Sequence, residues 1–294
     1  MGEAYRIFFS YNNEVVVPQR TIGVFDSGVG GLTVLQAIRK YLPEEDLIYL
    51  GDTARVPYGT KSPETVLRYA LQAAEFLCAH HVKMIVVACN TASSVALQIL
   101  THHFNVPVVG VIVPGAQEAV RVSTSGRIGV IGTEGTVNSG AYQHEISTLR
   151  DGVQVFSAVC PLFVPLAEEG WASHEIARLA AREYLQPLLH ENIDTLVLGC
   201  THYPLLKDTL RQVLPAQVSM VDSATQTAMT VKYLLQHNCT LRHDKLERIG
   251  SCRFYVTDVP TRFVRVGSAF LGEELKGVER VTLPAISPDM MRLP

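Results

Sequence analysis

Two stretches of this sequence end a short apolar run on a cysteine, and they constrain the fold more than any other feature. Residues 83–93 read Lys-Met-Ile-Val-Val-Ala-Cys-Asn-Thr-Ala-Ser, and residues 193–204 read Ile-Asp-Thr-Leu-Val-Leu-Gly-Cys-Thr-His-Tyr-Pro. Continuous apolar runs rich in β-branched residues are typical of buried parallel strands. Ligands of open α/β sheets bind outside the carboxyl ends of the strands, so we expect Cys89 and Cys200 to lie where chemistry takes place.

The surroundings of the two cysteines repeat along the chain. The tripeptide Ile-Gly-Val begins at residue 22 and again at residue 128, and the predicted strands and helices follow in the same order each time. The tripeptides lie 106 residues apart and the cysteines 111 residues apart. Such nearly constant spacing indicates a duplicated unit. We therefore expect an α/β fold of two similar doubly wound domains, related by pseudo-twofold symmetry, with the active site in the interdomain cleft.

The repeat also predicts the division of the chain. We expect an N-terminal extension at residues 1–19, a first α/β domain made of residues 20–114 and 224–294, and a second α/β domain at residues 115–223. The C-terminal part contains a helical pattern, a predicted strand at residues 252–258 and a last helix. It packs most simply back onto the first domain, so that the second domain is inserted between two parts of the first.

Composition narrows the classes of function. The chain has 294 residues, of which 47% are hydrophobic and 18% charged, and its formal net charge of -3 comes without a run of Lys or Arg. We therefore expect a globular protein that acts on a small molecule, with no nucleic-acid partner and no membrane partner. No apolar stretch approaches the roughly 20 residues of a membrane span and no signal peptide is recognisable, so a cytoplasmic location is predicted.

The cysteines are expected to be free thiols. The six of them form no Cys-x-x-Cys pair, which favours a reducing compartment, and no metal-ligand spacing is present, so no metal site is expected. We interpret four as packing residues, and Cys160 is the least certain because it also ends a predicted strand; the four are Cys78, Cys160, Cys239 and Cys252.

A glycine-rich turn follows the first predicted strand. It reads Asp-Ser-Gly-Val-Gly-Gly at residues 26–31 and leads into a helix, so its backbone N–H groups can hold an anion. The spacing differs from Gly-x-Gly-x-x-Gly, and Asp26 would repel a phosphate. A small substrate with both an ammonium and a carboxylate group fits this turn better than a dinucleotide.

Two thiols that face each other can exchange a proton on both sides of a carbon atom. Inverting an α-carbon needs one acid/base group on each face of a planar carbanion, and a thiol/thiolate pair supplies both at once. Asp26 is the candidate to tune Cys89, and His202 the candidate to tune Cys200. Each of these residues can also have a purely structural role. A single cysteine is usually a packing residue, and Asp26 or Asn90-Thr91 can cap a helix. Tyr58-Gly59 can form an ordinary turn.

Five linked motifs resemble those of the glutamate racemases in the aspartate/glutamate racemase family. They are residues 25–32, 51–62, 87–93, 131–137 and 198–205, and the resemblance runs from about residue 21 to about residue 270. It implies interconversion of L- and D-glutamate without a cofactor, which supplies D-glutamate for bacterial peptidoglycan.

The resemblance also implies roles for particular residues. Cys89 and Cys200 match the family's acid/base cysteines, assisted by Asp26 and His202, while Glu168 resembles an additional acidic group, with Glu169 adjacent to it. The expected substrate-binding residues are Asp26, Ser27, Tyr58, Gly59, Asn90, Thr91, Thr133, Thr136, Thr201 and His202.

The N-terminal extension departs from the usual family pattern. Some members with such extensions are activated by a nucleotide-linked cell-wall precursor, and a tail without a role is the simpler interpretation. Family members are usually homodimers, so a homodimer is expected.

The residues leave three other functions open. They are a racemase of aspartate or another small dicarboxylate, a hydrolase with one nucleophilic cysteine, and a two-domain solute-binding module.

Overall fold

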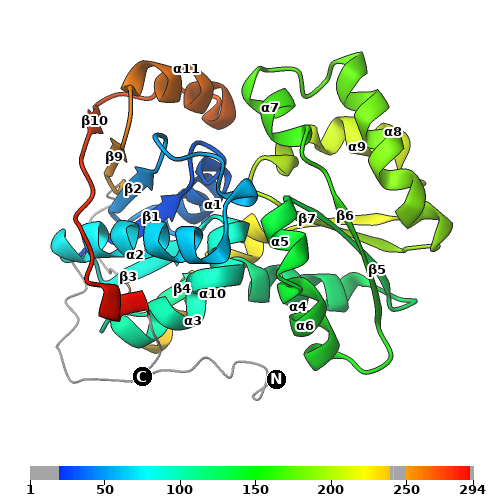
Figure 1. The fold of residues 1–294 in the computed structure, drawn as a ribbon, viewed down its shortest axis with the longest axis horizontal. Coiled ribbons are helices and arrows are strands. Elements are labelled where there is room, and N and C mark those ends of the chain that lie inside the picture. Colours follow the sequence, from blue (N-terminus) through cyan, green and yellow to red (C-terminus); the bar gives the residue numbers. More distant parts are fainter. Residues whose placement is uncertain (1–19, 239–240, 242–248, 292–294) are drawn as a thin grey trace.

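The computed structural model describes residues 20–238, 241 and 249–291, and it folds them into two halves that each contain one parallel sheet (Figure 1). The first sheet has the strand order β10-β9-β2-β1-β3-β4 and the second the order β6-β5-β7-β8. Both sheets carry helices, so the α/β class and the two-domain fold are confirmed. The N-terminal extension, residues 1–19, lies outside the described residues, as does Cys239.

The two sheets repeat the same core topology. In the first sheet β1 lies between β2 and β3, and in the second β5 lies between β6 and β7, with every pair parallel. The first-sheet strands are β1 (Ile22–Asp26), β2 (Leu47–Gly51), β3 (Met84–Val87), β4 (Val108–Gly110), β9 (Cys252–Val256) and β10 (Val278–Arg280). The second-sheet strands are β5 (Arg127–Gly132), β6 (Gln154–Val159), β7 (Thr195–Gly199) and β8 (Ser219–Asp222).

The helices follow the same division. Those of the first half are α1 (Leu32–Tyr41), α2 (Pro63–Ala79), α3 (Asn90–His103), α10 (Ser223–His237) and α11 (Pro260–Leu271). Those of the second half are α4 (Ile112–Val122), α5 (Glu134–Asn138), α6 (Ala141–Leu149), α7 (Phe163–Glu168), α8 (Glu175–His190) and α9 (Lys207–Val213). Short 3₁₀ turns lie at η1 (Tyr58–Thr60), η2 (Tyr203–Leu206) and η3 (Pro288–Met291).

The C-terminal part extends the first sheet. β9 pairs with β2 and β10 pairs with β9, both in parallel, so that residues far apart in the sequence form one sheet. Helix α10 packs on α1 of the first half and on α4 of the second, and its residues join an apolar cluster that continues through both halves. Burial of this shared apolar surface holds the halves together. The domain boundaries at residues 114/115 and 223/224 stay a prediction.

Local sequence signals explain several helix ends. Ser62 caps α2 as predicted, because its side chain accepts a hydrogen bond from the Thr65 N–H at 3.3 Å and Pro63 occupies the first helical position. The prediction that Pro114 opens the next helix is wrong: α4 begins two residues earlier, at Ile112. Proline is tolerated there because the first-turn N–H groups have no intrahelical partner.

The helix predicted to end at about Leu149 is divided into α5 and α6. The break lies at Gly140, whose φ of 66° is a left-handed conformation that favours glycine. Helix α7 and strand β10 were not predicted, because both are short and lack a clear period. None of the helices in the described part of the chain is long and apolar enough to cross a lipid bilayer.

Candidate active site

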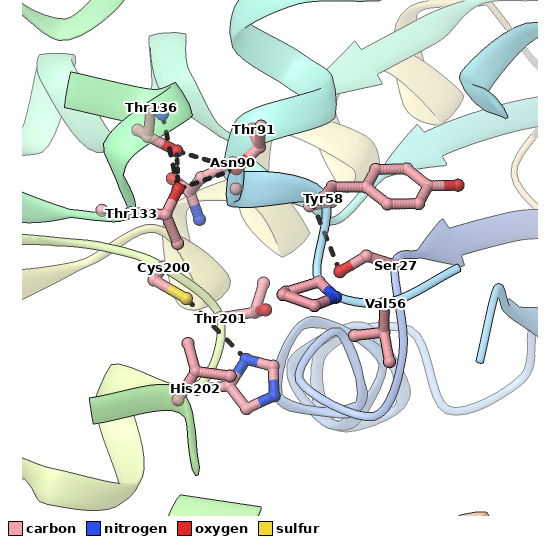
Figure 2. A pocket seen from close by; sticks show the side chains of 15 residues that line it. Ser27, Val56, Tyr58, Asn90, Thr91, Thr133, Thr136, Cys200, Thr201 and His202 are labelled. Atoms are coloured by element: carbon pink, nitrogen blue, oxygen red, sulfur yellow. Dashed lines mark hydrogen bonds between the residues drawn. The ribbon is translucent and has the colours of Figure 1, made fainter. Parts of the chain in front are cut away.

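A pocket lies between the carboxyl ends of the strands of the two sheets (Figure 2). Cys89 follows β3 and Cys200 follows β7, and both line this pocket, as the strand-end rule predicts. The pocket encloses about 330 Å³ of empty space, including the solvent at its mouth. The remaining lining residues are Ser27, Val56, Pro57, Tyr58, Gly59, Asn90, Thr91, Thr133, Thr136, Val164, Gly199, Thr201 and His202.

Cys89 lies in the more acidic part of the site. It is the last residue before α3, and its thiol donates a hydrogen bond to Ser27 Oγ at 3.8 Å. Burial and the nearby Asp26 carboxylate raise the pKa of Cys89 to about 12. Both causes disfavour the thiolate, so Cys89 is protonated at neutral pH.

Asp26 is buried behind the pocket and does not line it. It ends β1, and its Oδ2 accepts a hydrogen bond from the Gly28 N–H at 2.9 Å. Its Oδ1 accepts one from Thr201 Oγ1 at 3.4 Å, which links the two halves. Burial raises the pKa of Asp26, and the charge of His202 opposes that shift.

Cys200 has a basic neighbour instead. Its sulfur lies 3.7 Å from His202 Nδ1, and His202 Nε2 lies 3.1 Å from Glu168 Oε1 (Figure 2 shows the first contact). Burial alone lowers the pKa of His202, but the hydrogen bonds to Cys200 and Glu168 outweigh it and raise the pKa to about 10. The imidazole is therefore charged at neutral pH, and this positive charge lies beside the Cys200 sulfur.

The structure separates the two adjacent glutamates. Glu168, at the end of α7, reaches His202, whereas Glu169 is exposed and lies 3.6 Å from Arg262. Burial raises the pKa of Glu168, but His202 and Arg262 hold that pKa below its usual range. Of the two, Glu168 is the one placed behind the site.

Three threonine hydroxyls form a triangle in the lining of the pocket. Thr91 of α3 lies 2.9 Å from Thr133 and 3.1 Å from Thr136, and the latter two are 3.0 Å apart (Figure 2). Thr133 also caps α5. A Cβ at Gly59 would lie 2.4 Å from the Thr133 Cβ, so only glycine allows this approach. The triangle thus joins the walls that the two halves contribute.

Asn90 keeps one hydrogen-bond donor free in the described structure. Its Oδ1 accepts a hydrogen bond from the Tyr142 hydroxyl at 2.8 Å, while its buried Nδ2 has no partner among the described residues. Leaving a buried donor unsatisfied costs about 1–3 kcal/mol, so a ligand oxygen is the natural partner. Asn90 therefore brings an unpaired donor to the lining of the pocket.

Tyr58 lines the pocket, but its hydroxyl forms a hydrogen bond with a residue that does not line it. It donates to Asp52, the residue after β2, which also accepts from Arg55 Nε at 2.7 Å and from Thr257 Oγ1 at 2.8 Å. Asp52 had no predicted role. Its place directly after a buried strand was the signal that could have identified it as the residue that holds this loop.

Gly30 also shapes the site without a predicted role. A Cβ at this position would lie 2.3 Å from Thr201 Oγ1 and 2.5 Å from His202 Nδ1, so glycine lets the turn after β1 approach the Cys200 loop.

Cys78, Cys160 and Cys252 do not line the pocket. In the described ranges, no group of three or more His, Cys, Asp or Glu side chains is placed to hold a metal ion.

Comparison with known proteins identifies the family. Residues 22–231 match the family model described as Asp/Glu/Hydantoin racemase. The chain therefore belongs to the Asp/Glu/hydantoin racemase family, and it is an isomerase.

Individual relatives carry a more specific name than the family model does. The glutamate racemase of Geobacter metallireducens is 54% identical over 92% of this chain and 99% of its own length. A solved structure of glutamate racemase from Francisella tularensis with D-glutamate has a TM-score of 0.85 and 41% identity, covering 92% of this chain and 100% of that one. The Escherichia coli glutamate racemase, solved with L-glutamate and the activator UDP-MurNAc-ala, has a TM-score of 0.74 and 32% identity, covering 90% of this chain and 99% of that one.

Proposed function

We propose that this protein interconverts L- and D-glutamate without a cofactor, using Cys89 and Cys200 as its two acid/base groups. The observation that carries the proposal is that both thiols line one pocket from different sheets, one beside a carboxylate and the other beside an imidazolium. Relatives at 54% and 51% identity are glutamate racemases, which supports glutamate as the substrate.

The proton moves between the two thiols through the substrate. In one direction the Cys200 thiolate takes the α-proton, and the electron pair of the C–H bond stays on the substrate as a planar carbanion. The carbanion then takes a proton from the Cys89 thiol on its other face, which leaves a thiol at Cys200 and a thiolate at Cys89. The opposite enantiomer runs the same steps in reverse and restores the starting state.

The neighbours of each thiol fit this exchange. His202, held by Glu168, stabilises the thiolate form of Cys200, and burial beside Asp26 keeps the proton on Cys89 until a carbanion is present. The Asn90 Nδ2 donor and the threonine hydroxyls supply hydrogen bonds to the substrate carboxylates. Donors that are already in place stabilise charge that develops during the reaction without further rearrangement.

The cellular role follows from the substrate. We propose that the product D-glutamate supplies peptidoglycan synthesis in the cytoplasm, and that the protein acts as a homodimer. The Escherichia coli relative binds the activator UDP-MurNAc-ala, which supports a nucleotide-linked cell-wall precursor as an activator here.

The test is a racemisation assay on the purified protein without added cofactor. Circular dichroism of L-glutamate should decay to zero, with L-aspartate unchanged, and the assay is run with and without UDP-MurNAc-ala. Decay with aspartate alone would assign the protein to the aspartate racemases. A stable acyl-enzyme would indicate a thiol hydrolase, and binding of glutamate without α-proton exchange would indicate a solute-binding module.

A further inference from the structure

Arg262 makes a contact between the two halves of the molecule that the proposed chemistry does not yet use. It lies in the first turn of α11, while Glu168 ends α7, and Figure 1 shows these two helices facing each other. An Arg262 guanidinium N–H donates to Glu168 Oε2 at 3.1 Å, and the other oxygen of the same carboxylate lies 3.1 Å from His202 Nε2. One carboxylate therefore connects Arg262 to the histidine beside Cys200.

The position of Arg262 does not stabilise the helix in which it lies. The N-terminus of α11 carries partial positive charge, and Val259, which precedes the helix, provides no side-chain cap. A cation in that first turn is locally unfavourable. The Arg262 side chain is also 64% exposed, and exposed ion pairs contribute little to stability. Neither the helix nor the fold explains this arginine.

We propose that Arg262 is a positioning residue: its guanidinium fixes the Glu168 carboxylate in the orientation in which Glu168 holds His202 beside Cys200. The carboxylate is only 13% exposed, so it has few alternative partners. Because Arg262 belongs to the first half and Glu168 to the second, the contact forms only when the halves lie this close. Positioning of His202 is thereby tied to closure of the pocket. The inference rests on the proposed racemase function.

The kinetic test compares Arg262→Ala with Arg262→Lys and with two controls. We expect kcat for glutamate racemisation to fall roughly tenfold in Arg262→Ala with KM little changed. Losing the direct outer partner of a histidine costs about 10–100-fold in metal sites, and Arg262 acts one contact further out, through Glu168. Arg262→Lys should recover part of the loss. Arg265→Ala, an exposed arginine one turn further along α11, and Glu169→Gln should retain wild-type rates.

A pH profile distinguishes positioning from a merely structural effect. The charged groups that face Glu168 are His202 and Arg262, and both lower its pKa. Removing the guanidinium raises the pKa of Glu168, so the acid limb of the kcat profile should move to higher pH in Arg262→Ala, with an unchanged melting temperature. Wild-type kcat and an unmoved acid limb in Arg262→Ala would overturn the proposal.

A measurement without turnover separates this inference from the proposed function. Carboxyl-¹³C glutamate labelling of the protein allows the Glu168 signal to be assigned by its absence in Glu168→Gln and then titrated. Its pKa should rise in Arg262→Ala and stay in place in Arg265→Ala; no rise would overturn the contact. A wild-type protein that fails to racemise glutamate would refute the proposed function instead, while this titration would still decide whether Arg262 acts on Glu168.

Discussion

Cys89 and Cys200 occupy equivalent places in the two sheets, but their surroundings carry opposite charge. Each follows the strand that pairs with the first strand of its half, β3 beside β1 and β7 beside β5. Cys89 lies near the Asp26 carboxylate, and Cys200 lies 3.7 Å from the His202 imidazole. The duplicated topology thus provides the positions, and unduplicated side chains provide the difference between the two thiols.

The sequence repeat shows where that difference arises. At the spacing of the Ile-Gly-Val tripeptides, the counterpart of Asp26 is Gly132, and at the spacing of the cysteines the counterpart of His202 is Thr91. Each charged group therefore has an uncharged counterpart in the other half. A symmetric pair of thiols would both favour the same protonation state, whereas the proposed mechanism needs one acid and one base.

Removing either thiol should have the largest effect. We expect Cys89→Ala and Cys200→Ala each to lower kcat/KM by about a thousandfold or more, because positioned acid/base groups contribute roughly 10²–10⁴-fold. The measurement is the decay of circular dichroism with L- and D-glutamate. Cys160→Ala is the matched control, since Cys160 also follows a strand of the second sheet but does not line the pocket. Substantial activity in either single variant would contradict the two-thiol mechanism.

Removing the imidazole should affect one thiol more than the other. We expect His202→Asn to lower kcat/KM roughly a hundredfold, and equally in both directions, because the equilibrium constant between enantiomers is one. The asymmetry should emerge in the primary isotope effect of α-deuterated glutamate. That effect should increase for the enantiomer whose α-proton Cys200 takes. Equal isotope effects for both enantiomers would show that His202 does not act on Cys200 alone.

The charge on His202 should make stability depend on pH. Its pKa is about 10 in the folded protein against 6.5 for the free side chain, so the folded state holds a proton that the unfolded state has released between these values. Stability is therefore full below about pH 6.5 and is lost as pH rises toward 10, by roughly 5 kcal/mol at about 1.4 kcal/mol for each pKa unit. Thermal unfolding from pH 7 to 10 should show a steeper decline for the wild type than for His202→Asn; parallel curves would contradict the raised pKa.

A still smaller change is expected behind Asn90. Tyr142→Phe removes the hydroxyl that fixes Asn90 Oδ1, which should raise KM about threefold and lower stability by about 1 kcal/mol. Tyr184→Phe is the control, since Tyr184 contacts the Leu162 N–H outside the pocket. Titration with glutamate measures KM, and chemical denaturation measures stability. An unchanged KM would mean that Asn90 is oriented by other contacts.

The sequence predicted the features that depend on pattern and spacing. Buried apolar runs located the strands, Ser62 and Pro63 located the start of α2, and the repeat anticipated the shared topology of the sheets. Ser27 and Thr133 were expected at the pocket from the family resemblance, and both line it, each directly after a strand.

Features that depend on side-chain direction could not be predicted this way. The choice between Glu168 and Glu169 depends on how the short helix α7 packs, and the Tyr58 hydroxyl turns to Asp52 rather than to the pocket. Arg262 reaches Glu168 from a helix that lies 94 positions away in the chain. No local pattern encodes such contacts, because tertiary packing decides them.

The most direct test of the two-thiol mechanism is the origin of the α-hydrogen in the product. L-Glutamate is incubated with the protein in D₂O, and at low conversion the remaining L- and new D-glutamate are separated and their α-deuterium measured by mass spectrometry. Two thiols on opposite faces predict D-glutamate that carries deuterium and recovered L-glutamate that still carries protium. Deuterium entering the recovered L-glutamate as fast as it enters the product, or protium retained in the product, would contradict the assignment of one thiol to each face.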